Sequence, residues 1–132
     1  MPKILNSILI IFGIILIGLI GTIVLFFLAI RFLFAGACGN DILSTNDSPN
    51  GTYTAYVFAR DCGATTSISY QLSILKKDQI LENKVGNTFI SKEEFGVEWT
   101  DDTQLTVTYP TSAETFKMNN KRGKVDIVYL KK

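Results

Sequence analysis

The chain has 132 residues, of which 47% are hydrophobic, and its 13 basic and 12 acidic side chains nearly cancel. This balance argues against a nucleic-acid partner, which would need a clustered positive excess. The sequence has no histidine and only two cysteines. It therefore excludes Ser-His-Asp and Cys-His catalysis, zinc sites with histidine ligands and a four-thiolate metal site. We expect no enzyme activity, no metal and no cofactor.

An uncharged run covers residues 4–30, and only three of its side chains are polar. As a helix, this run would extend about 40 Å, which exceeds the hydrocarbon core of a bilayer, about 30 Å thick. It carries no polar stripe, so the pattern favours a helix that spans the membrane over one that lies in the interface. We predict a membrane anchor over residues 1–34, with the lipid bilayer as its partner.

The charges that flank this run predict its orientation. Lys3 and the free amino terminus lie before it, whereas beyond Arg31 the next basic residue is Arg60. The positive-inside rule then favours a cytoplasmic amino terminus and an extracytoplasmic remainder, joined by a single membrane pass.

The two cysteines allow two readings of the segment after the anchor. Cys38 ends "FAGAC" (34–38), which resembles the cleavage site of bacterial lipoproteins, although Ala35 stands where a large aliphatic residue is usual. A lipoprotein processed at Cys38 is therefore an alternative to the uncleaved anchor. On the oxidising side of a membrane, Cys38 and Cys62 are expected to form one disulfide, whereas two free thiols are the alternative on the cytoplasmic side.

Beyond residue 44, the sequence shows the period-two pattern of β-strands. In the segment 67–75, apolar residues alternate with serine and glutamine, so we predict one buried and one exposed face. Residues 35–52 are expected to form a linker, and residues 53–132 an extracytoplasmic β-domain. The predicted fold is a single N-terminal transmembrane helix followed by a small all-β domain, an antiparallel meander, open sheet or sandwich of five to seven strands. The expected strands are 52–60, 67–75, 87–90, 96–100, 104–109, 114–118 and 124–130.

Two resemblances extend this prediction. The segments "SPNGTYTAYVF" and "WTDDTQLTVTY" each place a turn before a strand and resemble the blade motifs of TolB-type propellers, but the chain is too short for a closed propeller. Most of residues 38–130, with "RDCGATT" as the most distinctive part, resembles a family of small bacterial membrane-anchored or lipid-anchored proteins of unknown function. This second resemblance implies fold and location rather than chemistry.

Two polar segments are candidates for function. "RDCGATTS" (60–67) places charge, glycine and hydroxyl groups together, so Arg60, Asp61, Thr65 and Thr66 form a candidate binding loop. The alternative is that these side chains satisfy backbone groups of a turn, as such residues often do. The segment 91–102 contains five carboxylates without calcium-loop spacing, which is typical of a solvated acidic edge.

These observations predict a membrane-tethered, non-enzymatic protein of the bacterial inner membrane whose extracytoplasmic β-domain binds a protein or an envelope component. An alternative is a small accessory subunit of a membrane complex that uses its helix as the interface. Gly18 and Thr22 also form a small-residue pair, and such pairs can let two helices approach closely.

Overall fold

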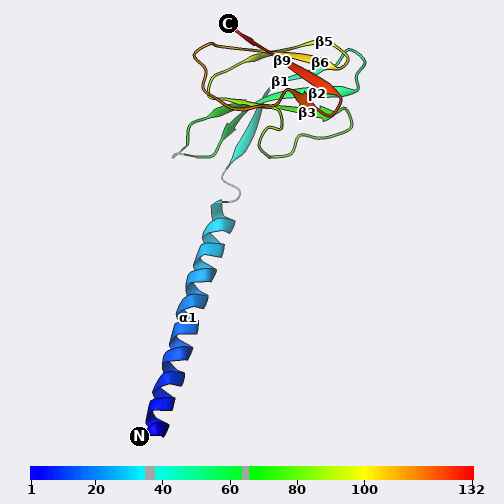
Figure 1. Cartoon of the computed structure of the whole chain (residues 1–132). Helices are drawn as coiled ribbons and strands as arrows, with labels where there is room; N and C mark the ends of the chain where they lie inside the picture. The colour runs from blue at the N-terminus through cyan, green and yellow to red at the C-terminus, as the bar shows by residue number, and fades with distance from the viewer. Residues whose placement is uncertain (35–37, 64–65) are drawn as a thin grey trace. The chain divides into compact units, whose positions relative to one another are not determined.

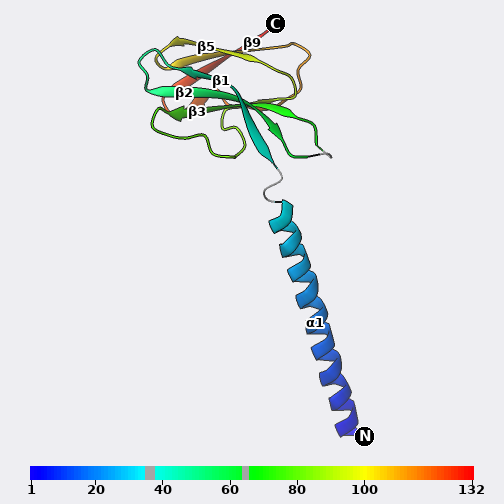
Figure 2. The same cartoon turned by 180° about the vertical axis from the view of Figure 1, so that it is seen from behind.

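The structure is a computed structural model that describes residues 1–34, 38–63 and 66–132. The chain divides into two compact units, Met1–Ala37 and Cys38–Lys132. The first is helical and the second consists of β-strands, as Figures 1 and 2 show from opposite sides. The predicted fold class, one N-terminal apolar helix followed by a small all-β domain, is confirmed.

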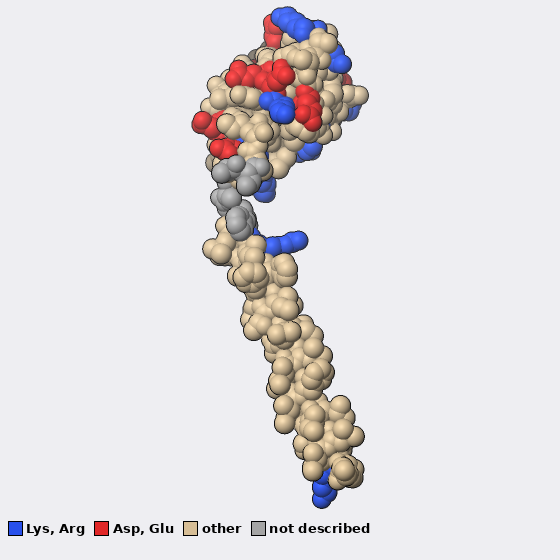
Figure 3. All heavy atoms as spheres, turned by 90° about the vertical axis from the view of Figure 1, so that its left-hand side faces the viewer, with Lys and Arg blue, Asp and Glu red and all other residues tan. Residues whose placement is uncertain are grey.

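Helix α1 spans Pro2–Phe34 without interruption. Two of its polar side chains bond within the helix: the Ser7 hydroxyl donates to the Lys3 carbonyl and the Thr22 hydroxyl donates to the Leu19 carbonyl. Most of the large apolar side chains from Ile4 to Leu33 are exposed, and Figure 3 shows charged atoms only near the two ends of the helix. The helix is long and apolar enough to cross a membrane.

The β unit consists of two sheets. Sheet A has the strand order β1-β2-β3-β4-β7 and sheet B has the order β5-β6-β9-β8. The strands of sheet A are β1 (Gly39–Asp47), β2 (Tyr53–Asp61), β3 (Ser69–Lys76), β4 (Phe89–Ser91) and β7 (Thr115–Met118). The strands of sheet B are β5 (Gly96–Asp101), β6 (Gln104–Tyr109), β8 (Lys121–Arg122) and β9 (Val125–Lys131).

The inner faces of the two sheets share one hydrophobic core, which makes the unit a sandwich. Alternate residues of each strand point inward, as the period of a β-strand requires. Sheet A contributes Ala55, Val57, Leu72, Ile74 and Phe89, and sheet B contributes Leu105, Val107, Tyr109, Val125 and Ile127.

Aromatic rings fill one part of this core. The ring centroid of Phe89 lies 4.8 Å from that of Phe95 and 5.4 Å from those of Tyr109 and Tyr129. The Tyr129 hydroxyl donates to the Asn119 carbonyl at 2.7 Å. Burial raises the pKa of Tyr129 to about 12, and the nearby Tyr109 makes a smaller contribution in the same direction.

Two features of the strand arrangement differ from the expectation. Residues 39–47 lie within the predicted linker, yet they form β1, which pairs with β2 at the edge of sheet A. Strands β6 and β9 run parallel, with Leu105 opposite Ile127, whereas the other strand pairs are antiparallel. The parallel pair arises because the chain crosses to sheet A and forms β7 there before it returns to sheet B.

Both faces of sheet A are covered near β3. The side chains of Gln71 and Ser73 were predicted to be exposed, yet both are buried. Phe58, which alternation places on the same outer face, is fully buried as well. The cover is the segment 77–88, which connects β3 to β4 and bonds to both Gln71 and Ser73. This segment is the outer loop of the domain.

Candidate functional site

The two cysteines meet where β1 begins and β2 ends. Their sulfur atoms lie 2.01 Å apart, at disulfide distance. Cys38 directly precedes β1 and Cys62 directly follows β2, so the pair closes the ladder next to the first register pair, Gly39 and Asp61. In this arrangement the Cys38 sulfur is not free to carry a lipid.

The predicted binding loop contributes to the fold through its polar atoms. The Arg60 guanidinium donates to the side-chain oxygens of Asn40 and Asn83. The Asp61 carboxylate accepts a hydrogen bond from the Gly63 amide at 2.9 Å. Of the predicted side chains, Arg60 and Asp61 therefore hold neighbouring backbone and side chains in place.

The hydroxyl group of Thr66 also bonds within this loop. The Thr66 hydroxyl donates to the Gly63 carbonyl at 3.3 Å. Gly63 has a φ of 97°, which a residue with a side chain rarely adopts, so it closes the turn. Thr65 lies outside the described residues. In the described part of this loop, the Asp61 and Thr66 side chains therefore bond to backbone groups of the turn.

The middle of the outer loop is bonded to residues at the beginning of β1. The Asn40 amide donates to the carbonyls of Glu82 at 3.3 Å and Lys84 at 2.8 Å. The Asn83 amide donates to the Cys38 carbonyl at 2.8 Å. Together with the bonds from Arg60, these contacts join the outer loop to the cysteine pair.

The end of the outer loop is fixed to β3. The Gly86 amide donates to the Gln71 side-chain oxygen at 2.6 Å, and Asn87 exchanges two side-chain hydrogen bonds of 3.0 Å with the Ile74 backbone. The Lys117 ammonium donates to the Gly86 carbonyl at 2.9 Å. These bonds involve buried or half-buried groups, so the outer loop is a built part of the sandwich.

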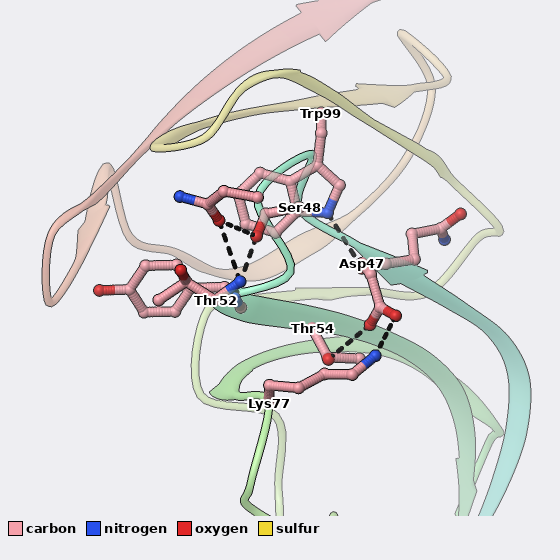
Figure 4. Close-up of polar contacts among 9 residues, drawn as sticks. Asp47, Ser48, Thr52, Thr54, Lys77 and Trp99 are labelled. Atoms are coloured by element: carbon pink, nitrogen blue, oxygen red, sulfur yellow. Dashed lines mark hydrogen bonds and ion pairs between the residues drawn. The ribbon is translucent and has the colours of Figure 1, made fainter.

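A second polar cluster lies at the β1–β2 turn (Figure 4). The Asp47 carboxylate accepts hydrogen bonds from Lys77 and from the Thr54 hydroxyl. These bonds, that of Lys77 above all, lower the pKa of Asp47. Nearby, the Trp99 indole nitrogen donates to the Asn46 carbonyl at 3.0 Å, which connects β5 of sheet B to β1 of sheet A. This cluster therefore stabilises the fold across the two sheets.

Two adjoining hollows, of about 660 and 720 Å³, form a groove on the described part of the domain. Leu75, Gln79 and Arg122 line both hollows, so the hollows meet at these residues. One hollow extends along the outer loop, and the other extends towards the β8–β9 turn. We refer to the two hollows together as the basic groove. Its charged lining residues are Lys76, Asp78, Glu82, Lys84, Arg122 and Lys124.

Sequence reasoning missed the basic groove because its parts are far apart in the chain. Leu75 ends a predicted strand, while Arg122 and Lys124 flank a turn before the last strand. Gly123 between them has a φ of 62°, as expected for the tight turn of a β-hairpin. The "KRGK" sequence, basic residues around a glycine before a strand, was the available signal for a cationic turn.

The carboxylates of the acidic segment 91–102 lie on several different elements. Within the described ranges, no three acidic or cysteine side chains are placed so that they could hold a metal ion. Glu93, Glu98 and Asp102 are exposed and lie on a loop, a strand and a turn, respectively. This placement is consistent with a solvated edge.

The sequence of the chain matches a protein family over residues 3–119, and the chain belongs to this family, the family of unknown function DUF5412. The match includes most of the helix and the β domain as far as the end of β7. No curated protein and no solved structure matches the chain.

Proposed function

We propose that the chain is a membrane-tethered, non-enzymatic protein whose β domain is displayed outside the cytoplasm, where it binds a protein or an envelope component. The observation that carries this proposal is the apolar helix of Pro2–Phe34 followed, four residues later, by Cys38 at disulfide distance from Cys62. An exposed apolar helix of this length requires lipid, and a disulfide persists in an oxidising compartment. Together they favour an amino terminus in the cytoplasm.

The polar interior supports a binding role rather than catalysis. Every buried side-chain nitrogen or oxygen of the described residues has a hydrogen-bond partner. The clusters around Arg60 and Asp47 consist of groups that hold strands and turns together. A catalytic centre usually needs a nucleophile or an acid–base pair that is aimed into a cavity, whereas the basic groove carries cationic and amide groups suited to recognition.

Reporter fusions and mass spectrometry test this proposal together. Alkaline phosphatase fused after Lys132 should be active, whereas green fluorescent protein at the same position should not fluoresce after export. Non-reducing mass spectrometry of the full chain should find a peptide pair cross-linked through Cys38 and Cys62, with residues 1–37 still attached. A fluorescent cytoplasmic reporter would reverse the orientation, and an acyl group on Cys38 would establish a lipoprotein instead.

Exchange of the helix separates a tether from an interface. Replacement of residues 1–34 by an unrelated membrane helix should leave binding by the β domain unchanged, because a tether needs only length and apolarity. Loss of the interaction on this exchange, with the β domain still folded, would favour the accessory subunit that assembles through its helix.

A further inference from the structure

We infer that the basic groove binds an extended peptide segment of a partner protein, in which carboxylates lie next to an apolar side chain. This inference rests on the proposed function, because it names the chemistry of the partner that the β domain would bind. It follows from the charge, the hydrogen-bonding groups, the apolar lining and the rigidity of the groove.

The charge of the groove is opposite to that of the rest of the domain. Lys76, Arg122 and Lys124 are exposed, and their side chains make no salt bridge or hydrogen bond with any described residue. Lys84 is already paired with Glu82. Of the lining side chains, only Asp78 remains to offset three cations, although acidic residues slightly outnumber basic ones beyond the helix. Such a local positive excess favours an anionic ligand.

The polar groups of the groove are mainly hydrogen-bond donors. The Gln79 side-chain oxygen accepts a bond from the Lys76 amide at 3.1 Å, which leaves the Gln79 NH₂ group to face a ligand. The Asn50 side-chain oxygen accepts bonds from Ser48 and Thr52, which likewise leaves the Asn50 NH₂ group. With Arg122, these groups suit a ligand rich in acceptors, such as carboxylates and peptide carbonyls.

The groove also exposes apolar surface. Ile80 is 87% exposed and Val85 is 52% exposed, and both lie in the outer loop that lines one hollow. Leu75 of β3, which is half-buried, lines both hollows. A purely ionic polymer would leave this surface in water, so an apolar group between the anionic groups fits better. Because Ile80 and Val85 face solvent rather than an enclosed tunnel, a peptide side chain fits better than a long acyl chain.

The walls of the groove are held in place before any ligand binds. Gly86 and Asn87 fix the end of the outer loop to β3, and Asn40 and Asn83 fix its middle near β1. The tight turn at Gly123, which has a φ of 62°, also lines the groove. A site that is already ordered loses less conformational entropy on binding, which favours capture of a flexible segment.

Selection from a peptide library tests the inference without knowledge of the natural partner. The full chain is placed in nanodiscs of neutral phosphatidylcholine and is used to select from displayed random eight-residue peptides. The same nanodiscs with the double variant R122Q/K124Q serve for counter-selection. We expect the enriched peptides to combine Asp or Glu with a neighbouring apolar residue.

Affinities of one enriched peptide then define the site. By fluorescence anisotropy, R122Q/K124Q should weaken binding roughly tenfold or more, because the double variant removes two charged donors from the site. The matched control K131Q/K132Q removes two exposed cations outside the groove and should leave the affinity within about twofold. Replacement of the acidic residues of the peptide by their amides should weaken binding to the unaltered chain in the same way.

Three outcomes would overturn the inference: no enrichment of acidic residues, equal loss of affinity in both double variants, or equal affinity for the peptide and its amide form. Groove-dependent binding of short-chain phosphatidylglycerol without any enriched peptide would assign the groove to an anionic lipid instead. The amide peptide needs no protein variant, so the test stands even if a variant fails to fold. Because the selection is independent of orientation in the cell, its failure is distinguishable from failure of the reporter experiment.

Discussion

Gly86 of the outer loop lies directly against Gln71 of β3. Its amide donates to the Gln71 side-chain oxygen at 2.6 Å, and a Cβ atom on Gly86 would lie 3.0 Å from both the Gln71 Cβ and the Leu72 carbonyl oxygen. This contact is the tightest that any glycine of the described β domain makes. The outer loop therefore approaches sheet A as closely as a backbone without a side chain allows.

The first prediction concerns this contact. Gly86→Ala should destabilise the domain by about 1–3 kcal/mol, because the added methyl group meets the backbone of an interior strand that cannot move aside. The measurement is chemical unfolding followed by the fluorescence of Trp99, the single tryptophan. Gly96→Ala is the matched control, since a Cβ at Gly96 meets nothing within 4 Å. Equal stability of the two variants would contradict the close approach.

The second prediction concerns the cysteine pair. The double variant C38S/C62S should lose about 2–4 kcal/mol of unfolding free energy, because the cross-link restricts the unfolded chain. Cys38 and Cys62 are separated by 24 in the sequence, and a cross-link that closes a loop of this length is expected to have an effect of this size. Unfolding of the unaltered chain in the presence of a reductant should reproduce the loss, and the reductant should have no effect on the variant. Unchanged stability of C38S/C62S would show that the sulfurs are not linked.

The third prediction separates structure from binding at Arg60. Arg60→Ala should cost about 1–3 kcal/mol of stability, because two side-chain oxygens lose a charged donor. In a double-mutant cycle, Arg60→Ala and Asn83→Ala should show coupling of about 0.5 kcal/mol or more. Peptide binding in the basic groove should persist in Arg60→Ala once the folded fraction is taken into account. Purely additive effects would mean that the two side chains do not act together.

The fourth prediction concerns acid. Hydrogen bonds from Lys77 and Thr54 lower the pKa of Asp47, so the folded state holds this proton less tightly than the unfolded state. The resulting stability is present above the ordinary aspartate pKa and is lost as the pH falls through the lowered pKa. Unfolding in urea over a series of acidic pH values measures the free energy of unfolding. As the pH falls, this free energy should decrease less for Asp47→Asn than for the unaltered chain. Lys77→Gln, which removes the largest cause, should fall between them.

The fifth prediction concerns alkali. The pKa of Tyr129 is raised from 10.0 to about 12, so the folded state retains its proton where the unfolded state releases it. The contribution of Tyr129 to the free energy of unfolding is fully present below its ordinary pKa, and it should be lost as the pH rises from 10.0 towards about 12. Tyr129→Phe should reduce this fall and should cost about 1 kcal/mol near neutral pH, because the hydrogen bond to Asn119 is lost. A spectrophotometric titration in which all five tyrosines ionise together near pH 10.0 would contradict it.

Alternation of apolar residues predicted the strands that form the core. Leu105, Val107 and Tyr109 alternate with threonine and glutamine, and all three are buried in β6. By contrast, β1 has the polar sequence "GNDILSTND", and most of its side chains are exposed. An edge strand of this kind is specified by its pairing with β2, which the local sequence does not reveal. The parallel pairing of β6 with β9 is a long-range choice of the same kind.

The candidate site was predicted only in part. The turn at residues 60–67 was recognised as polar, and its Arg60, Asp61 and Thr66 side chains bond to neighbouring groups. The burial of Gln71 and Ser73 was missed because their cover comes from the outer loop, whose polar sequence has no periodic pattern. The basic groove was missed for a related reason: a groove is formed by the packing of distant segments, and no single segment carries its pattern.

The position of the cysteine pair determines how the domain responds to mechanical tension. A pull on the chain from the helix enters the β unit at Cys38, immediately before the first residue of β1. Without a cross-link, that pull would peel β1 from β2 one hydrogen-bonded pair at a time, beginning with Gly39 and Asp61. With the sulfurs joined, the force passes directly into an interior strand of sheet A. The cross-link would therefore protect this end of the β1–β2 ladder from a pull on the chain.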